Sequence, residues 1–177
     1  MNANSREEYG RDKVRGFALL VLILLSPALS GPVAAAGIDV PDPQLRDTCP
    51  VCGMLVARYP AWIATVLYDD GHADHFDGAK DLFKYLFDLP RYAPGRSAEA
   101  ISAIGVTEYY GLTRIDAHHA WFVIGSDVLG PMGHELIPLE TEADAVEFRE
   151  DHQGTRILRF DEVTADLLQR LDAGEIR

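Results

Sequence analysis

The sequence predicts an α+β fold in which two tandem ββαβ units are followed by a C-terminal helix. Short runs rich in aromatic and β-branched residues, bounded by Asp, Gly and Pro, are typical of strands. Longer segments with apolar residues at helical spacing begin after residues that often cap helices. The order strand, strand, helix, strand occurs twice, so we expect two similar units, recognised by pattern order rather than by identical letters.

The first unit is expected within residues 37–110. Residues 61–68 combine β-branched and aromatic side chains and are predicted to form a strand, and the Asp-Asp-Gly turn after it leads into a second strand over 72–76. Asp77 is predicted to be the N-cap of a helix whose apolar residues share one face. A strand over 103–110 completes the unit.

The second unit, with the C-terminal helix, is expected within residues 111–177. Its strands are predicted over 119–125, 134–139 and 155–160. Thr141 is predicted to cap a helix that runs to about His152, before the last of these strands. Asp161 is predicted to cap the C-terminal helix. The buried face of that helix is predicted to contain Val163, Leu167 and Leu171.

Residues 1–36 have the parts of a secretory signal peptide. Arg11, Lys13 and Arg15 precede the apolar run 16–25, and small residues and prolines follow it up to Ala36. As a helix, this run would extend about 15 Å, half of a hydrocarbon layer about 30 Å thick, so a membrane anchor is the weaker interpretation. We expect cleavage near Ala36 and a mature protein that is soluble and periplasmic or otherwise exported.

The charge and the motifs exclude several classes of function. The formal net charge is −12; residues 1–36 contain four Lys/Arg and three Asp/Glu, so their removal makes it −13. Such a chain repels phosphate backbones, and nucleic acid is not expected as a partner. The sequence also lacks the spacing of a hydrolase triad and a phosphate-binding glycine loop. We therefore predict a binding protein and not an enzyme.

The two cysteines and the two internal methionines lie in two short clusters. The stretch CPVCGM contains Cys49, Cys52 and Met54, and the stretch GPMGH contains Met132 and His134. In extended backbone, residues on either side of a glycine point the same way, so each cluster can present two donor atoms together. Thiolate and thioether sulfur are soft donors, and imidazole suits copper. The clusters therefore predict a Cu(I) site.

The same residues allow other interpretations. Methionine most often fills a core. A structural zinc site could use Cys49, Cys52 and a histidine, but no second Cys/His pair at matching spacing follows. A thiol-disulfide oxidoreductase using Cys49 and Cys52 is the main functional alternative in an oxidising compartment, although Gly53 and Pro60 oppose the helix that should follow its motif. An inert structural disulfide is the remaining alternative.

Three stretches together resemble the NosL family of exported copper-binding accessory proteins for nitrous oxide reductase. They are CPVCGM, YDDGHADHFDGAKDLFKYL and GPMGHELIP. The resemblance covers nearly all of the expected mature chain. It implies a fold similar to the tandem ββαβ prediction, and a metallochaperone that delivers Cu(I) toward the copper-sulfide site of the reductase. It also implies two partners, the reductase and its ABC-type membrane maturation complex.

The resemblance also implies roles for individual residues. Cys52, Met132 and His134 are the leading copper ligands, Met54 is an alternate, and Cys49 is an accessory thiol. One departure concerns the membrane. Members of the family are typically lipoproteins tethered through a cysteine at the end of the signal, and this sequence has no cysteine there. Membrane association is therefore expected only through an uncleaved signal.

Overall fold

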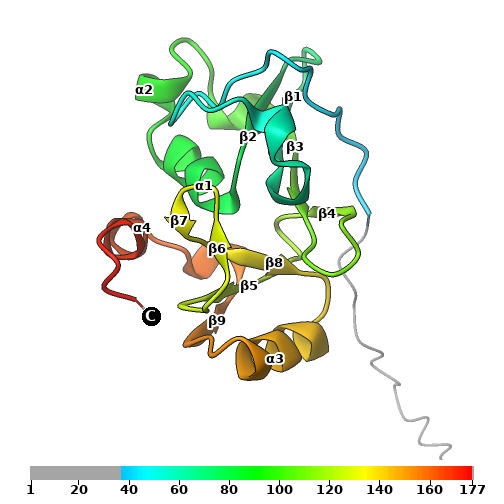
Figure 1. Ribbon diagram of the computed structural model, residues 1–177. Helices are drawn as coiled ribbons and strands as arrows, with labels where there is room; N and C mark the ends of the chain where they lie inside the picture. The colour runs from blue at the N-terminus through cyan, green and yellow to red at the C-terminus, as the bar shows by residue number, and fades with distance from the viewer. Residues whose placement is uncertain (1–36, 177) are drawn as a thin grey trace, which may run out of the picture. The chain divides into compact units, whose positions relative to one another are not determined.

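A computed structural model describes residues 37–176 (Figure 1). The predicted signal peptide, residues 1–36, lies outside the described residues. The described chain contains both helices and strands, and its strand pairs are antiparallel, which confirms the α+β class. Within residues 37–176, no helix combines the length and the apolar character needed to cross a membrane.

The first sheet is built around the predicted strand that is rich in β-branched residues. This strand begins at Ala64 rather than at residue 61, because Pro60–Trp62 forms a 3-10 turn. A turn with Gly71 at φ 82° leads into the second strand, and this left-handed conformation is one that glycine adopts without steric cost. The strand order is β2-β1-β3-β4. The bounds are β1 Ala64–Tyr68, β2 Ala73–Phe76, β3 Ile101–Thr107 and β4 Arg114–Asp116.

The second sheet has the order β8-β5-β9, and a separate hairpin pairs β6 with β7. The bounds are β5 Trp121–Ile124, β6 Leu129–Gly130, β7 Gly133–His134, β8 Ile137–Leu139 and β9 Arg156–Leu158. In each sheet, the strand that comes first in the sequence lies between two others. However, β4 adds a fourth strand to the first sheet, and the β6–β7 hairpin lies in the sequence between β5 and β8 of the second. The tandem ββαβ arrangement and its boundary near residue 110 therefore stay predictions.

The strand predicted over residues 134–139 is divided in two. β7 ends at His134 and β8 begins at Ile137, with Glu135 and Leu136 between them. The carboxylate of Glu135 turns inward and accepts the Leu136 N–H at 2.9 Å, so this backbone donor is used locally. A side chain that satisfies its own neighbouring backbone in this way competes with strand pairing.

Residues 37–176 contain four α-helices, and the starts of these helices differ partly from the predictions. The helices are α1 Ala79–Phe87, α2 Leu89–Tyr92, α3 Glu142–Asp151 and α4 Ala165–Asp172. Thr141 caps α3, accepting the Asp144 N–H, as predicted. The cap predicted at Asp161 is wrong, because Phe160–Glu162 forms a 3-10 turn and Thr164 caps α4 instead. The N-cap of α1 is Gly78, not Asp77.

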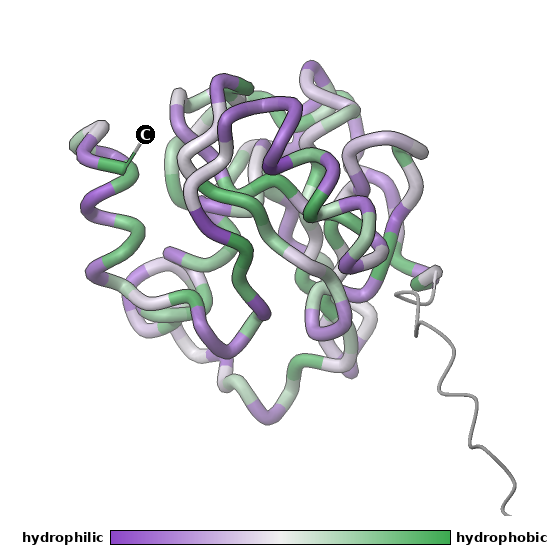
Figure 2. Tube along the Cα trace, turned by 90° about the horizontal axis from the view of Figure 1, so that it is seen from below, coloured by the Kyte–Doolittle hydropathy of each residue, from purple (hydrophilic) through white to green (hydrophobic). Residues whose placement is uncertain are grey.

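Helix α1 joins the two sheets through the larger of the two hydrophobic core clusters of the described chain. It packs against β1, β2 and α4. The ring of Phe83 lies 5.3 Å from that of Phe122 on β5 and 5.0 Å from that of Phe160, between centroids. Helix α4 contributes three buried leucines, and burying each such side chain stabilises the fold by roughly 1.5–3 kcal/mol. Figure 2 shows hydrophobic and hydrophilic residues alternating along this C-terminal helix. Contacts with β1, β2, β5 and α4 therefore hold α1 in place.

Candidate metal centre

The C-x-x-C segment forms a tight turn that directs both sulfur atoms to one side. The Cys49 N–H donates to the Met54 carbonyl at 2.9 Å, and the Gly53 N–H donates to the Cys49 carbonyl at 2.8 Å. Gly53 has φ 80°, which explains why a glycine stands there. Cys49 is 1% exposed, whereas Cys52 is half-buried, and both thiols are free. Of the two, Cys52 is the one that an incoming ion can reach.

Two aspartates at the start of α1 meet these thiols. The Cys52 thiol donates to Asp77 Oδ1 at 3.1 Å, and the Cys49 thiol donates to Asp81 Oδ2 at 3.4 Å. One ligand atom from each residue lies within 4.8 Å of the other three. Neither aspartate was predicted from the sequence as part of the site. Asp77 was assigned to helix capping, and Asp81 was not singled out. The usable signal was their spacing of four residues, which places them on one side of a helix start.

Burial and the neighbouring carboxylates keep the thiols protonated. Burial raises the pKa of Cys49 to about 12, and the charge of Asp81 acts in the same direction. The pKa of Cys52 is raised even further, by burial and by hydrogen bonds with Asp77, Cys49 and Asp81. A protonated thiol is a weak nucleophile. The metal-free site is therefore poorly suited to attack a disulfide.

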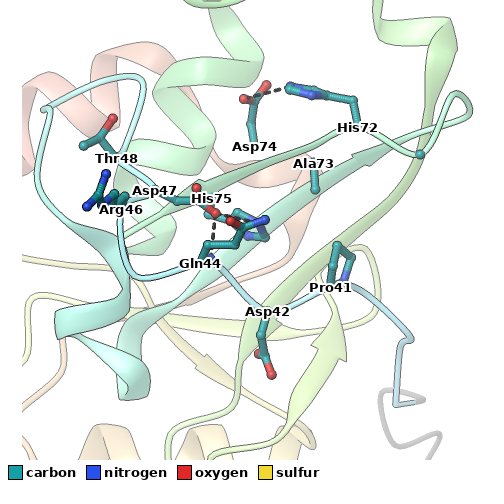
Figure 3. A pocket seen from close by; sticks show the side chains of 11 residues that line it. Pro41, Asp42, Gln44, Arg46, Asp47, Thr48, His72, Ala73, Asp74 and His75 are labelled. Carbon is teal, nitrogen blue, oxygen red and sulfur yellow. Dashed lines mark hydrogen bonds and ion pairs between the residues drawn. The ribbon is translucent and has the colours of Figure 1, made fainter.

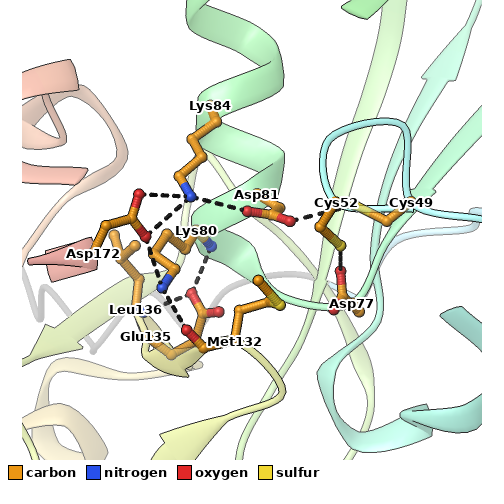
Figure 4. Close-up of polar contacts among 10 residues, drawn as sticks. All are labelled: Cys49, Cys52, Asp77, Lys80, Asp81, Lys84, Met132, Glu135, Leu136 and Asp172. Carbon is orange, nitrogen blue, oxygen red and sulfur yellow. Dashed lines mark hydrogen bonds and ion pairs between the residues drawn. The ribbon is translucent and has the colours of Figure 1, made fainter. Parts of the chain in front are cut away.

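The β6–β7 hairpin brings Met132 to the same place. Met132 is 45% exposed at the hairpin turn and, with Cys52 and Asp81, lines a cavity of about 740 Å³ between α1 and α4. Figure 4 shows its side chain extending toward those of Cys52 and Asp77. The structure thus brings together the two sulfur residues, from distant parts of the sequence, on which the copper prediction depends most.

A buried charge network fixes the hairpin against α1. Lys80, 1% exposed, donates from Nζ to the Met132 carbonyl at 3.0 Å and pairs with Asp172 at 3.1 Å (Figure 4). The Lys80 N–H donates to Glu135 Oε1 at 2.6 Å. Burial raises the pKa of Glu135 to about 8. A Cβ at Gly78 would collide with the Glu135 carboxylate, so a larger residue at the helix start would force that carboxylate to move. The position of Met132 is therefore set by α1.

The backbone at two glycines differs from the extended form assumed from the sequence. Gly53 and Gly133 have φ of 80° and 83°. The residues on either side of each glycine therefore do not share one face, as they would in a strand. The site pairs Cys52 with Met132 across segments, rather than pairing neighbours within each cluster.

Neither His134 nor Met54 lines the cavity that Cys52 and Met132 share. His134 is half-buried in β7 beside Gly174, where an added Cβ would lie 3.9 Å from the ring atoms Cδ2 and Nε2. Its Nδ1 is buried and has no hydrogen-bond partner within residues 37–176. Met54 holds the cysteine turn through its carbonyl and does not line the cavity. The ligand roles of both residues stay predictions.

The sequence model of the NosL family matches residues 42–168. This chain belongs to the NosL family. The crystal structure of the copper chaperone NosL from Shewanella denitrificans is 28% identical to it, with a TM-score of 0.57, and the match covers 77% of this chain and 99% of that chain. The solution NMR structure of the apo-NosL protein from Achromobacter cycloclastes is 23% identical, with a TM-score of 0.42, covering 59% and 87%. No curated protein matches the sequence.

The donor set of this NosL-family protein suits metal binding better than thiol-disulfide exchange. Thiol oxidoreductases place the reactive cysteine at a helix N-terminus, which lowers its pKa. Here the turn after Cys52 leads into the 3-10 segment Val56–Arg58, and the pKa of both thiols is raised. Two thiols, one thioether and two carboxylates instead converge beside an open cavity. Such a group can bind a soft or borderline metal ion.

A second cavity, of about 560 Å³, lies beside β2 on another part of this NosL-family fold (Figure 3). It is lined by His72 and His75 among others, but these side chains have separate partners. His72 pairs with Asp74 at 3.2 Å, whereas Nδ1 of His75 lies 3.0 Å from Thr65 Oγ1. Burial lowers the pKa of His75, which favours its neutral form. These contacts account for both rings without a ligand.

Proposed function

We propose that this protein is a metallochaperone, and not an enzyme, that binds Cu(I) and delivers copper for assembly of the copper-sulfide site of nitrous oxide reductase. The observation that carries the proposal is the position of Cys52 and Met132, which line one open cavity although they come from different segments. Membership of the NosL family and the similarity to a structure described as a copper chaperone support it.

Capture of copper begins at the exposed sulfur atoms. The thioether of Met132 has no proton to lose, so it can take Cu(I) at any pH that the fold tolerates. The Cys52 thiol must release its proton when copper binds, because the thiolate is the ligand. Soft sulfur donors favour Cu(I) over the hard cations that prefer oxygen. His134 is the proposed third donor. Its buried Nδ1 has no hydrogen-bond partner within residues 37–176, so this nitrogen is available to bind an ion.

Release of copper uses the open side of the cavity. Met132 is 45% exposed, so a donor from the recipient can reach the ion from solvent. Replacing one ligand at a time avoids a free ion at any step, and a low-coordinate Cu(I) site leaves room for the entering donor. The sulfur atoms of Cys49 and Cys52 are within 4.8 Å of each other, so a two-electron oxidant could join them in a disulfide with release of both thiol protons. That bond would block capture, because Cys52 would have no thiolate to offer.

The proposed recipient is nitrous oxide reductase, acting with its ABC-type membrane maturation complex. The proposed location of the protein is the periplasm or another compartment outside the cytoplasm. Both rest on the resemblance of the cysteine and methionine motifs to the family and on the signal-like residues 1–36.

Removing the gene from the source organism is expected to yield reductase that lacks most of its copper-sulfide absorption. Restoring wild-type protein should restore that absorption, and restoring the Met132→Leu variant should not, because leucine keeps the bulk but has no donor atom. Leu129→Ala, at an exposed position of the same hairpin, is the matched control and should restore it. Reductase with a full copper-sulfide site in the deletion strain would contradict the delivery proposal.

A further inference from the structure

Strand β2 forms one edge of the first sheet, because in the described chain it pairs only with β1. The Tyr68 N–H donates to the His72 carbonyl at 2.9 Å. Hydrogen-bonded pairs alternate along an antiparallel ladder, so Asp74 is the next residue of β2 that bonds to β1. The backbone N–H and C=O groups of Ala73 and His75 therefore point away from β1. Among the described residues, no backbone group outside the sheet bonds to them.

The cavity of about 560 Å³ lies along this free edge, and we call it the β2 groove. Residues 71–75 form one wall, and residues of the segment 41–48 form the other. Figure 3 shows Ala73 and His75 on the side of β2 that faces this segment, and Asp74 on the opposite side. Ligand pockets of proteins measure about 300–1,000 Å³, so the β2 groove has room for a short stretch of peptide.

The charges of the β2 groove favour a basic occupant. Three aspartates and one arginine line it, and burial lowers the pKa of His75, which favours its neutral form. Asp42 Oδ1 accepts a hydrogen bond from Arg114, and Asp47 Oδ2 accepts the Gln44 N–H. In the described chain, the second oxygen of each of these two carboxylates is free to pair with a cation. The negative net charge of the protein also attracts basic partners over longer distances.

We propose that an extended, basic segment of a partner protein binds in the β2 groove and adds a strand to the first sheet. Its backbone pairs with the outward N–H and C=O groups of Ala73 and His75, which is how peptides bind by strand addition. Side chains of a strand point alternately to its two faces, so the residues opposite Ala73 and His75 share their face. That face lies toward Asp47, because His75 Nε2 is 4.0 Å from Asp47 Oδ2. Lysine or arginine at these positions of the segment pairs with Asp42 and Asp47.

The β2 groove is separate from the proposed copper site and is connected to it through the chain. The groove and the cavity beside Cys52 and Met132 share no lining residue. The wall formed by residues 41–48 leads directly into the cysteine turn, where the Val56 N–H donates to the Asp47 carbonyl at 3.0 Å. A segment bound in the groove therefore lies beside the chain that carries the cysteines and leaves the proposed ligands uncovered. Its binding does not require copper.

The test uses an acetylated octapeptide of alternating lysine and threonine with the reduced, metal-free protein. This peptide is expected to bind in a calorimetric titration and to slow hydrogen exchange at the amides of Ala73 and His75, measured by NMR. The same peptide with every lysine nitrogen of the backbone methylated cannot donate to β2 and should not bind. A glutamate-threonine peptide has the wrong charge and should not bind either. Ala73→Pro should weaken binding at least about 10-fold, because proline has no N–H, and edge strands tolerate proline.

Charge variants test the same surface without changing the strand. The double variant Asp42→Asn/Asp47→Asn should bind the lysine-threonine peptide at least about 5-fold more weakly, whereas Asp151→Asn, at an exposed position of α3, is the matched control and should bind as wild type does. Circular dichroism establishes that the variants fold, and their Cu(I) affinity should change less than about 3-fold because the two sites are separate.

Three results would overturn the proposal. The first is that wild type does not bind the lysine-threonine peptide. The second is that Ala73→Pro, or the backbone-methylated peptide, binds as well as the unmodified pair, since the edge of β2 would then not be used. The third is a dimer in sedimentation that Ala73→Pro abolishes, because a second copy of the chain would then occupy the edge in place of a basic partner.

Discussion

Cys52→Ser is expected to weaken Cu(I) binding more than about 100-fold, whereas Cys49→Ser keeps most of the affinity. Cys52 lines the open cavity with Met132, while Cys49 is 1% exposed and faces Asp81. Loss of a partner outside the ligands already costs roughly 10–100-fold in metal affinity, so loss of a ligand should cost more. The measurement is an anaerobic titration of each variant against a chelator of known Cu(I) affinity.

The control for this pair is stability, because Cys49 is part of the core. Burying a serine hydroxyl there should lower the free energy of unfolding by about 1–3 kcal/mol without removing Cys52, the proposed copper ligand. Denaturant unfolding of both metal-free variants separates the two effects. If Cys49→Ser loses copper and Cys52→Ser retains it, the accessible thiol has been misassigned.

Lys80→Met should weaken Cu(I) binding at least about 10-fold although Lys80 offers no soft donor. Its Nζ donates to the Met132 carbonyl and pairs with Asp172, so the substitution removes the contact that holds the hairpin against α1. Methionine preserves the length of the apolar stem. Removing one partner of a fully buried ion pair lowers the free energy of unfolding by about 3–5 kcal/mol. Because Asp172 is 45% exposed and keeps its pairing with Lys84, we expect Lys80→Met to lower the free energy of unfolding by about 1–3 kcal/mol.

Affinity and stability together show which role Lys80 has. Arg170→Met, on the neighbouring helix α4, breaks an exposed ion pair with Glu175 at 3.8 Å and is the matched control, expected to change stability by less than about 1 kcal/mol. A Lys80→Met protein that is less stable but binds copper as wild type does would show that the lysine supports the fold without positioning Met132.

The sequence predicted those parts of the fold that local patterns determine. Residues 64–68 form a strand because β-branched and aromatic side chains dominate there, and Thr141 caps its helix because its hydroxyl can accept a nearby N–H. β4 and β6 escaped prediction because each has only two or three residues and neither lies in a longer run of β-branched and aromatic side chains. The break at Glu135 depends on a distant contact with Lys80, which no local pattern encodes.

The candidate site was predicted in its residue types and not in its arrangement. Sulfur donors in two clusters identified Cys52 and Met132, and the structure places both beside one cavity. The extended backbone assumed at Gly53 and Gly133 was wrong, because both glycines have positive φ. Asp77 was missed because a carboxylate before a helix resembles a cap, and Asp81 because an acidic residue in the first turn of a helix is common without a ligand role. Only their burial beside the thiols sets them apart.

The most direct test of a copper site formed by Cys52 and Met132 is X-ray absorption at the copper edge of anaerobically loaded protein. Wild type should show Cu(I) with sulfur neighbours from both residues and a nitrogen neighbour from His134. Met132→Leu and Cys52→Ser should each lose one sulfur neighbour, and His134→Ala should lose the nitrogen. A Met132→Leu spectrum with the same number of sulfur neighbours as wild type would contradict the account, since copper would then bind without the hairpin.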